Sequence, residues 1–570
     1  MMSTLALTSC LESKKPSNIE TDIIAPIIPT DKELLNKYDI RQLDLINLSD
    51  GYTIKANKLN TYYKKNSKIG YLGLRDLINS LEGYYLKDYL SYEINNDVIE
   101  FRYKNDKETY FKIDTINDVI ETNYETFFDF TNSNSSISYA SHYKVMEEKV
   151  IDKAKDIVFN IKDYGFDSII LKDDVLLPIS LINILALETN LAHLIYNEDA
   201  FYFYDYYLEP DIRLKSNNKR LNGTDIDKEI LDEKNRSLYF LLDNFYGLKK
   251  SKNIDSFKDL IESNPSIYSK ITSTKVEDNN LGMHMLLYDL LDDPHTSIGY
   301  KSNYDTIKGL KDVNIRLNRP EGKRGNLINR IYSELLDYYY DMGSRKLVTF
   351  LGNTAFFKVD NFLVGSNDEI YNKNGTIKDD AYKYDTFYLF KKAFELISSK
   401  PEITNVVLDF SHNLGGVLDA AISTIGFLTN DDIIAPYELT LEGQSAFTRY
   451  AIDSDDDGSI EDLDAYTNYN YYLLSSEATF SAGNYFTALC KDMGLAKIIG
   501  QKSGGGKCGV SECSLIDGSS FRLSGTYALS GYKDGKAHDI EFGVDVDYFL
   551  PYDKFYDYKY INSLIQDGII

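Results

Sequence analysis

The sequence contains no tryptophan, and cysteine, proline and histidine are all rare, at 4, 11 and 6 residues. The cysteines form no CxxC pair and no histidine-rich cluster, so we do not expect a zinc site. Positive charge is also scarce, because 62 Lys and Arg stand against 88 Asp and Glu, a formal net charge of −26. Without a basic cluster, nucleic acid is not an expected partner.

The sequence also has no long hydrophobic run. No stretch approaches the roughly 20 apolar residues that a membrane-spanning helix needs, so membrane contact is expected only through the N-terminus. There, "LALTSC" ends at Cys10 and a polar, proline-containing stretch follows. The segment resembles a bacterial lipobox, which implies a lipid-anchored protein exported to the cell envelope, on its outer face or in the periplasm. It lacks the basic residues and apolar length of a signal peptide, so a chance cysteine is the alternative.

Apolar residues make up 43% of the chain, which is enough to form buried cores. The chain has 570 residues, too many for a single core, and we expect a multidomain α/β protein. Periodicity and composition divide it into four parts. These are a lipobox-like start and linker, one or two small α+β units, a mainly helical segment and an α/β core, at residues 1–50, 51–208, 211–345 and 346–560.

A weak internal similarity lies within the predicted α+β region. Residues 70–81 (GYLGLRDLINSL) and 175–186 (VLLPISLINILA) share an expected strand and helix, with "LIN" near the middle. The pattern is consistent with a duplicated unit, and chance similarity is the alternative. In the helical segment, Pro294 follows a predicted helix and fixes the turn that carries His295.

A serine stands at a predicted strand–turn–helix junction in "ATFSAGNYF", residues 478–486. The strand "YNYYLLSS" precedes it, and apolar residues recur at helical spacing after it. At such a junction the Ser481 side chain can project clear of the sheet, and the first N–H groups of the helix can hold developing negative charge. The alternative is that Ser481 only caps the helix.

Four further stretches accompany this junction: "DPHTSI" near 295, "NVVLDFSHNLGG" (405–416), "AKIIGQKSGGGKCGV" (496–510) and "EFGVDVD" (541–547). In order and spacing they resemble the serine peptidases that include the C-terminal processing (tail-specific) proteases and the tricorn core. The resemblance covers about residues 280–550. It implies a C-terminal α/β core of crotonase-like or ClpP-like fold that cleaves peptides or protein segments through an acyl-enzyme.

The resemblance also implies roles for individual residues. Ser481 would be the nucleophile. The N–H of Ala482 and one N–H of the Gly415–Gly416 pair would form the oxyanion hole. No cofactor would be required.

Two bases are open. One arrangement uses His295, oriented by Glu541, as in the tricorn core, and the other uses Lys507, as in the processing proteases. We favour His295, because an imidazole with a pKa near 6.5 is a ready base at neutral pH, whereas a lysine needs a shift of several units.

Two positions depart from the family pattern, namely Ser411 in place of an arginine and Asn484 in place of an acidic residue. Residues 299–345 are too few for the PDZ domain of many processing proteases, which favours a tricorn-like branch without that domain. These departures leave a rival reading open: a surface lipoprotein that binds peptide or glycan on a peptidase fold without turnover.

A second motif, "DSDDDGSIEDLD" at residues 453–464, has the spacing of a calcium-binding loop of EF-hand type. Oxygen ligands at such spacing suit calcium, and clustered carboxylates without a cation would repel one another. We expect a structural calcium ion here, with a solvated acidic turn as the alternative. The expected ligands are Asp453, Asp455, Asp457, Ser459 and Asp464.

Overall fold

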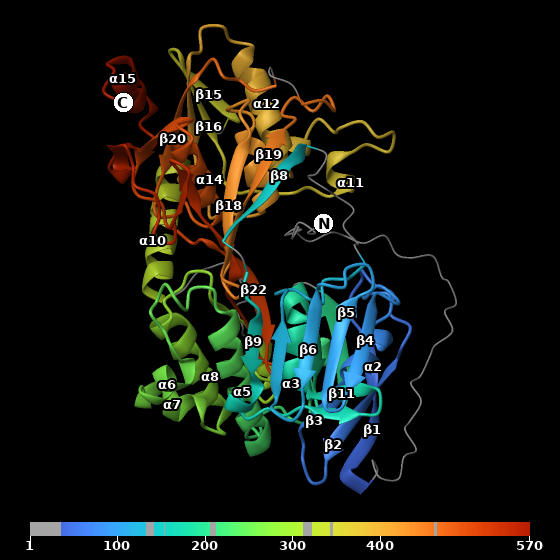
Figure 1. Ribbon diagram of the computed structural model, residues 1–570. Coiled ribbons are helices and arrows are strands. Elements are labelled where there is room, and N and C mark those ends of the chain that lie inside the picture. Colours follow the sequence, from blue (N-terminus) through green and yellow to red (C-terminus); the bar gives the residue numbers. More distant parts are fainter. Residues whose placement is uncertain are drawn as a thin grey trace.

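The computed structural model describes residues 36–132, 142–152, 154–205, 213–311, 322–341, 346–460 and 464–570. The chain forms a lower part from its N-terminal half and an upper part from its C-terminal half (Figure 1). Cys10 lies outside the described residues. Within them, no helix has both the length and the apolar character needed to span a membrane.

The lower part contains two sheets. One has seven strands in the order β10 (Ile169–Leu171), β11 (Asp174–Pro178), β3 (Gly70–Gly73), β2 (Lys58–Lys64), β1 (Tyr38–Asn47), β13 (Ala200–Asp205) and β12 (Ala192–Tyr196). The other has five, β4 (Leu90–Asn95), β5 (Val98–Tyr103), β6 (Tyr110–Asp114), β7 (Val119–Thr122) and β9 (Ile157–Asn160).

The two similar segments of the sequence lie side by side in the seven-stranded sheet. Strand β3 runs into helix α2 (Leu74–Ser80), and β11 runs into α3 (Ile179–Ala186). The two strands pair antiparallel, with Leu177 opposite Leu72. The predicted strand–helix pattern is therefore confirmed in both segments.

The helical segment supplies α5 (Lys228–Phe245), α6 (Phe257–Glu262), α7 (Pro265–Ile271), α8 (Val276–His284), α9 (Ile307–Lys311) and α10 (Gly322–Asp341). Helix α5 matches the apolar periodicity of its sequence and is capped by Asp227, whose side chain accepts the Glu229 N–H. Helix α8 continues as a π-helical turn, Met285–Leu290, that leads to His295.

The upper part is built on a six-stranded sheet. Its strands follow the order β15 (Val348–Leu351), β16 (Thr354–Lys358), β17 (Asn405–Asp409), β20 (Asn470–Ser475), β21 (Ala496–Gly500) and β26 (Tyr548–Phe549), all parallel except β15. Its helices are α11 (Asn367–Ile370), α12 (Thr386–Ser398), α13 (Leu418–Ile425), α14 (Ala482–Asp492) and α15 (Tyr558–Gln566). This arrangement agrees with the predicted α/β core.

A further six-stranded sheet joins segments from all over the chain. It runs β14 (Ser297–Tyr300), β23 (Ser520–Leu529), β18 (Ile433–Leu439), β19 (Gln444–Ile452) and β8 (Tyr143–Asp152), with β22 (Cys508–Ser514) also paired to β23. A hairpin of β24 (Gly531–Lys533) and β25 (Lys536–His538) follows β23. Figure 1 shows β8 beside β18 and β19 in the upper part, whereas β22 extends toward the lower part.

The four parts predicted from the sequence do not each pack as a separate unit. Strand β8 comes from the predicted α+β region but pairs with β19 of the α/β core. In the opposite direction, Cys508, Cys513 and Phe521 of the β22–β23 hairpin belong to the hydrophobic core of the lower part. Alternation of apolar residues indicates a strand but not the strand it pairs with, so sequence patterning could not reveal this exchange.

Candidate active site

Ser481 occupies the junction between β20 and α14, and its backbone is strained. Its φ is 54° and its ψ is −124°, a conformation that residues with a side chain rarely adopt. The side chain is half-buried and makes no capping hydrogen bond to the helix. Such strain costs of order 1–3 kcal/mol and is held by the surrounding structure. The capping alternative therefore does not describe the Ser481 side chain.

Glycine is required beside the serine. A Cβ atom placed on Gly415 would lie only 2.8 Å from the Ser481 Cβ, so the loop after β17 approaches the nucleophile closely. The Gly415 N–H donates to the Asn413 Oδ1 at 2.8 Å. Among the described residues, the N–H groups of Ala482 and Gly416 have no acceptor. Ala482 and Gly416 are thus the two donors that remain for a developing oxyanion.

His295 lies among the neighbours of Ser481. Its ring centroid is 4.6 Å from that of Phe480, the residue before Ser481. A Cβ on Gly506 would lie 3.1 Å from its Cε1, and the adjacent Gly505 accepts the Ser481 N–H at 2.8 Å. The structure therefore brings the predicted base and nucleophile to the same Gly-rich loop.

The two ring nitrogens of His295 have different surroundings. Its Nδ1 is 3.4 Å from the Ser524 Oγ, and its Nε2 is buried without a partner among the described residues. No hydrogen bond between His295 and Ser481 occurs there. Burial lowers the pKa of His295, with Asp293 opposing this shift and Arg324 adding to it. The ring is therefore neutral at neutral pH and able to accept a proton.

The predicted contact between Glu541 and His295 is absent from the described contacts. Glu541 Oε1 accepts from Arg324 Nη1 at 2.8 Å, and its Oε2 accepts the Lys507 N–H at 3.1 Å. Instead, the Asp293 Oδ1 accepts the backbone N–H of His295 at 3.0 Å and so stabilises the turn that carries the histidine. Asp293 stands two residues before the histidine and could have been noticed in the sequence, whereas Arg324 gave no signal there.

Lys507, the alternative base, is directed to another carboxylate. Its Nζ lies 3.4 Å from the Asp539 Oδ1, in an ion pair whose acidic side chain is half-exposed. Among the described residues, its Nζ makes no hydrogen bond to Ser481, whereas the His295 ring lies against Phe480. The described contacts therefore favour His295 over Lys507.

The two departures from the family pattern both make structural contacts. The Ser411 Oγ donates to the Asp409 Oδ1 at 2.6 Å and lies 2.7 Å from the Tyr556 hydroxyl. Asn484 donates to the Ile540 carbonyl at 3.0 Å and accepts from the Ser503 Oγ at 2.7 Å. These bonds support the two loops around Ser481 without a buried arginine or a second acidic group.

Comparison with known protein families decides the identity of this region. Residues 374–548 match the model of peptidase family S41. This part of the chain belongs to peptidase family S41. Peptidase family S41 is a family of serine-type hydrolases. The match includes Ser481, Gly416 and Glu541 but not His295, which the tertiary structure adds from outside it.

No curated protein matches the chain. Three similar solved structures are the photosystem II D1 C-terminal processing protease (19% identity, TM-score 0.25), mature CPAF (15%, 0.28) and the tricorn protease (12%, 0.31). These matches cover 35%, 39% and 84% of this chain and 42%, 55% and 46% of theirs. The chain thus spans less than half of the processing protease, and at these scores the similarity supports no residue roles.

The acidic loop follows β19 in the S41 domain. The carboxylates of Asp453, Asp455 and Asp457 lie within 4.8 Å of one another. Ser459 is exposed, and its N–H donates to the Asp457 Oδ1 at 2.8 Å. The Asp464 carbonyl accepts from the Ser454 Oγ at 2.8 Å, and Asp464 is not part of the carboxylate cluster. The structure thus gathers three of the five expected ligands.

Calcium binding at this loop stays a prediction. Added Ca²⁺ is expected to raise the Tm of the wild type, because the ion neutralises three adjacent carboxylates. Asp455→Asn should abolish the increase. Asp456→Asn is the matched control: it keeps the increase, because Asp456 pairs instead with Lys391 at 3.2 Å. Equal Tm values with Ca²⁺ and with EGTA would contradict the prediction.

Proposed function

We propose that the protein is a serine endopeptidase that cleaves peptides or protein segments through an acyl-enzyme on Ser481, with His295 as general base. The observation that carries the proposal is the strained, uncapped Ser481 beside two N–H groups without acceptors. A serine that only closed a helix would adopt an ordinary conformation and bond to it. The S41 family match supports the same chemistry.

The reaction follows from this arrangement. The Ser481 Oγ attacks the substrate carbonyl carbon while the His295 Nε2 accepts the hydroxyl proton. The Ala482 and Gly416 N–H groups stabilise the oxyanion of the tetrahedral intermediate. Its collapse expels the amine, which takes the proton from His295 and leaves an acyl-serine. Water, deprotonated by the same histidine, then releases the acid and regenerates Ser481.

The fold and branch are part of the proposal. Glycine loops at the ends of β17 and β21, with Ser481 between them, support a crotonase-like or ClpP-like core. The absence of a hydrogen bond between His295 and Ser481 does not argue against the tricorn-like pair, because catalytic bonds are often long without substrate. The net charge of −26 favours neutral or basic polypeptides as substrates.

Covalent labelling tests the nucleophile directly. Incubation with a serine-directed fluorophosphonate is expected to add one phosphonyl group to the wild type, detected by intact mass and assigned to Ser481 by peptide mapping. Ser481→Ala should give no adduct. Ser476→Ala is the matched control, because Ser476 is a buried serine that donates to the Ser411 carbonyl. Absence of labelling in the wild type, with calcium present, would favour the rival function.

That rival is a surface lipoprotein that binds peptide or glycan without cleaving it. The observation that favours it is that Ser411 and Asn484 stand in place of the arginine and the acidic residue of the family pattern. A binding protein has no need of an activated hydroxyl, so labelling distinguishes the two functions.

Export and lipid anchoring are proposed from the sequence around Cys10 alone. We expect the protein expressed in a bacterial host to incorporate labelled palmitate and to sediment with membranes. Cys10→Ala should abolish both, because Cys10 is the residue that would carry the lipid. Cys490→Ala, a buried cysteine, is the control. Equal labelling of wild type and Cys10→Ala would refute the anchor.

A further inference from the structure

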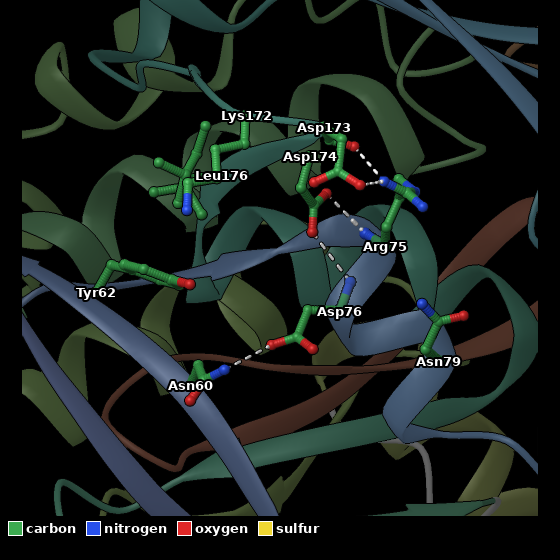
Figure 2. A pocket seen from close by; sticks show the side chains of 10 residues that line it. Asn60, Tyr62, Arg75, Asp76, Asn79, Lys172, Asp173, Asp174 and Leu176 are labelled. Carbon is green, nitrogen blue, oxygen red and sulfur yellow. Dashed lines mark hydrogen bonds and ion pairs between the residues drawn. The ribbon is translucent and has the colours of Figure 1, made fainter. Parts of the chain in front are cut away.

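The seven-stranded sheet of the lower part carries a polar cavity of about 260 Å³. It lies where strand β2, the start of helix α2 and the β10–β11 hairpin meet (Figure 2). None of its lining residues belongs to the S41 domain, so the cavity is separate from the Ser481 site. It lies between the two similar strand–helix units, at the β3–β11 pairing.

The interior of the cavity presents hydrogen-bond acceptors. The Asp76 carboxylate accepts a single long bond, 3.4 Å, from the Asn60 Nδ2. Only 5% of the surface of Tyr62 is exposed. Its hydroxyl has no partner among the described residues. Figure 2 shows this hydroxyl directed into the cavity toward Asp76 and Asp174. A phenol hydroxyl that faces a cavity without a protein partner can donate to, or accept from, a ligand or water there.

The second interior carboxylate, Asp174, caps helix α2. It accepts the N–H groups of Arg75 and Asp76 at 2.9 and 3.0 Å, in place of Gly73, which has no side chain. It also accepts the Val175 N–H at 2.8 Å, and a carboxylate has about four acceptor positions, so one is left for a ligand. Burial raises the pKa of Asp174 to about 6 and raises that of Asp76. Both groups also act on Tyr62, whose pKa is raised first by burial and then by these two carboxylates. The interior therefore favours a positive ligand.

Two cationic residues, Arg75 and Lys172, also line the cavity, and Arg75 is engaged at its rim. The Arg75 Nη1 pairs with the Asp173 Oδ2 at 2.6 Å, and its guanidinium stacks 3.7 Å from the Tyr92 ring centre. Lys172 is exposed. An anion entering the cavity would meet Asp76 and would have to displace these contacts. Among the described residues, the group of three carboxylates close enough to share a metal ion is in the 453–457 loop and not in this cavity.

We propose that this cavity binds the ammonium group of an alkylamine, such as the side chain of a lysine in a polypeptide. An ammonium has three N–H donors, and the Asp76 carboxylate, the Asp174 carboxylate and the Tyr62 hydroxyl supply three acceptors. Leu171 and Leu176 line the same cavity and accommodate the alkyl stem. The lower part thus contributes a lysine-binding site to the protein.

Calorimetry on the full chain tests the site. The chain carries Ser481→Ala, so binding is measured without turnover and independently of the proposed peptidase function. The probe is Nα-acetyl-lysine N-methylamide, and the norleucine analogue, which lacks the ammonium, is its matched control. The lysine probe is expected to bind at least tenfold more tightly. n-Butylamine is a second probe. If it binds as tightly as the lysine probe, the amine alone is recognised, and if it binds more weakly, the peptide portion contributes. Both outcomes support the site.

Variants separate the site from nonspecific charge effects. Asp76→Asn is expected to weaken the lysine probe by tenfold or more, because a charged bond is lost, and Tyr62→Phe by about three- to tenfold. Asp173→Asn, on the rim, should change affinity less than twofold. Equal binding of lysine and norleucine probes, or wild-type affinity in both Asp76→Asn and Tyr62→Phe, would overturn the proposal. If Asp76→Asn fails to fold by circular dichroism, Tyr62→Phe decides.

Discussion

His295→Ala is expected to slow fluorophosphonate labelling of Ser481 by about 10³–10⁴-fold. The serine hydroxyl is a weak nucleophile until a neighbouring base accepts its proton. Within the described part of the chain, the His295 Nε2 is buried without a partner and its ring lies beside Phe480, so it is the base that the structure offers. The second-order labelling rate constant, measured by intact mass over time, is the readout.

The matched comparison is Lys507→Ala. We expect it to label within about threefold of wild type, because Lys507 is paired with Asp539. Loss of labelling in Lys507→Ala with retention in His295→Ala would instead establish a serine–lysine pair. His284→Ala serves as a second control, since His284 is exposed on α8.

The pH dependence of labelling follows from the surroundings of His295. Burial lowers the pKa of His295, and only the neutral ring accepts a proton. The rate should therefore rise with pH through an apparent pKa below 6.5 and stay level above it. A rate that continued to rise above pH 8 would point to an amine base.

Lys234→Met is expected to destabilise the protein by about 3–5 kcal/mol, because it leaves Asp517 buried as an unpaired charge. The Lys234 Nζ lies 2.7 Å from the Asp517 Oδ2, and both side chains are 0% exposed. Burial would raise the pKa of Asp517, but Lys234 and Ser519 hold it below its usual value. The pair joins helix α5 to the turn between β22 and β23, so it links the lower part to the S41 domain.

Urea denaturation of the full chain measures this effect. The double variant Lys234→Met, Asp517→Leu should recover most of the lost stability, because removing both charges removes the desolvation cost. Lys68→Met is the matched control. Lys68 forms an ion pair with Asp227, and both side chains are partly exposed to solvent, at 56% and 30%. The expected loss of stability is therefore below about 1 kcal/mol. A loss of that small size in Lys234→Met would contradict the argument.

Local features of the site could be read from the sequence. A strand, a small turn and an apolar 3.6-residue repeat placed Ser481 at the start of a helix, and α14 begins at Ala482. The Gly415–Gly416 pair after a buried strand indicated a loop that a ligand can approach, and Gly415 does lie against Ser481. These features depend on neighbouring residues in the chain, which is why periodicity and glycine placement were sufficient.

Contacts between distant segments were beyond the sequence. The partner of Glu541 is Arg324 and not His295, and the histidine turn is held by Asp293. Motif order can suggest which residues share a site, but the choice among several buried carboxylates depends on side-chain packing. The strained φ of Ser481 is likewise imposed by its surroundings, since no residue type at that position specifies it.

By itself, the sequence determined the α/β class, the nucleophile turn and the glycine loop, because composition and short-range periodicity carry that information. Only the tertiary structure decided that β8 pairs with β19 and that the β22–β23 hairpin completes the core of the lower part. It also decided which acceptors line the cavity around Asp76. Each of these depends on segments about a hundred or more positions apart meeting in space. The pattern of a strand records which face is buried but not the neighbour that buries it.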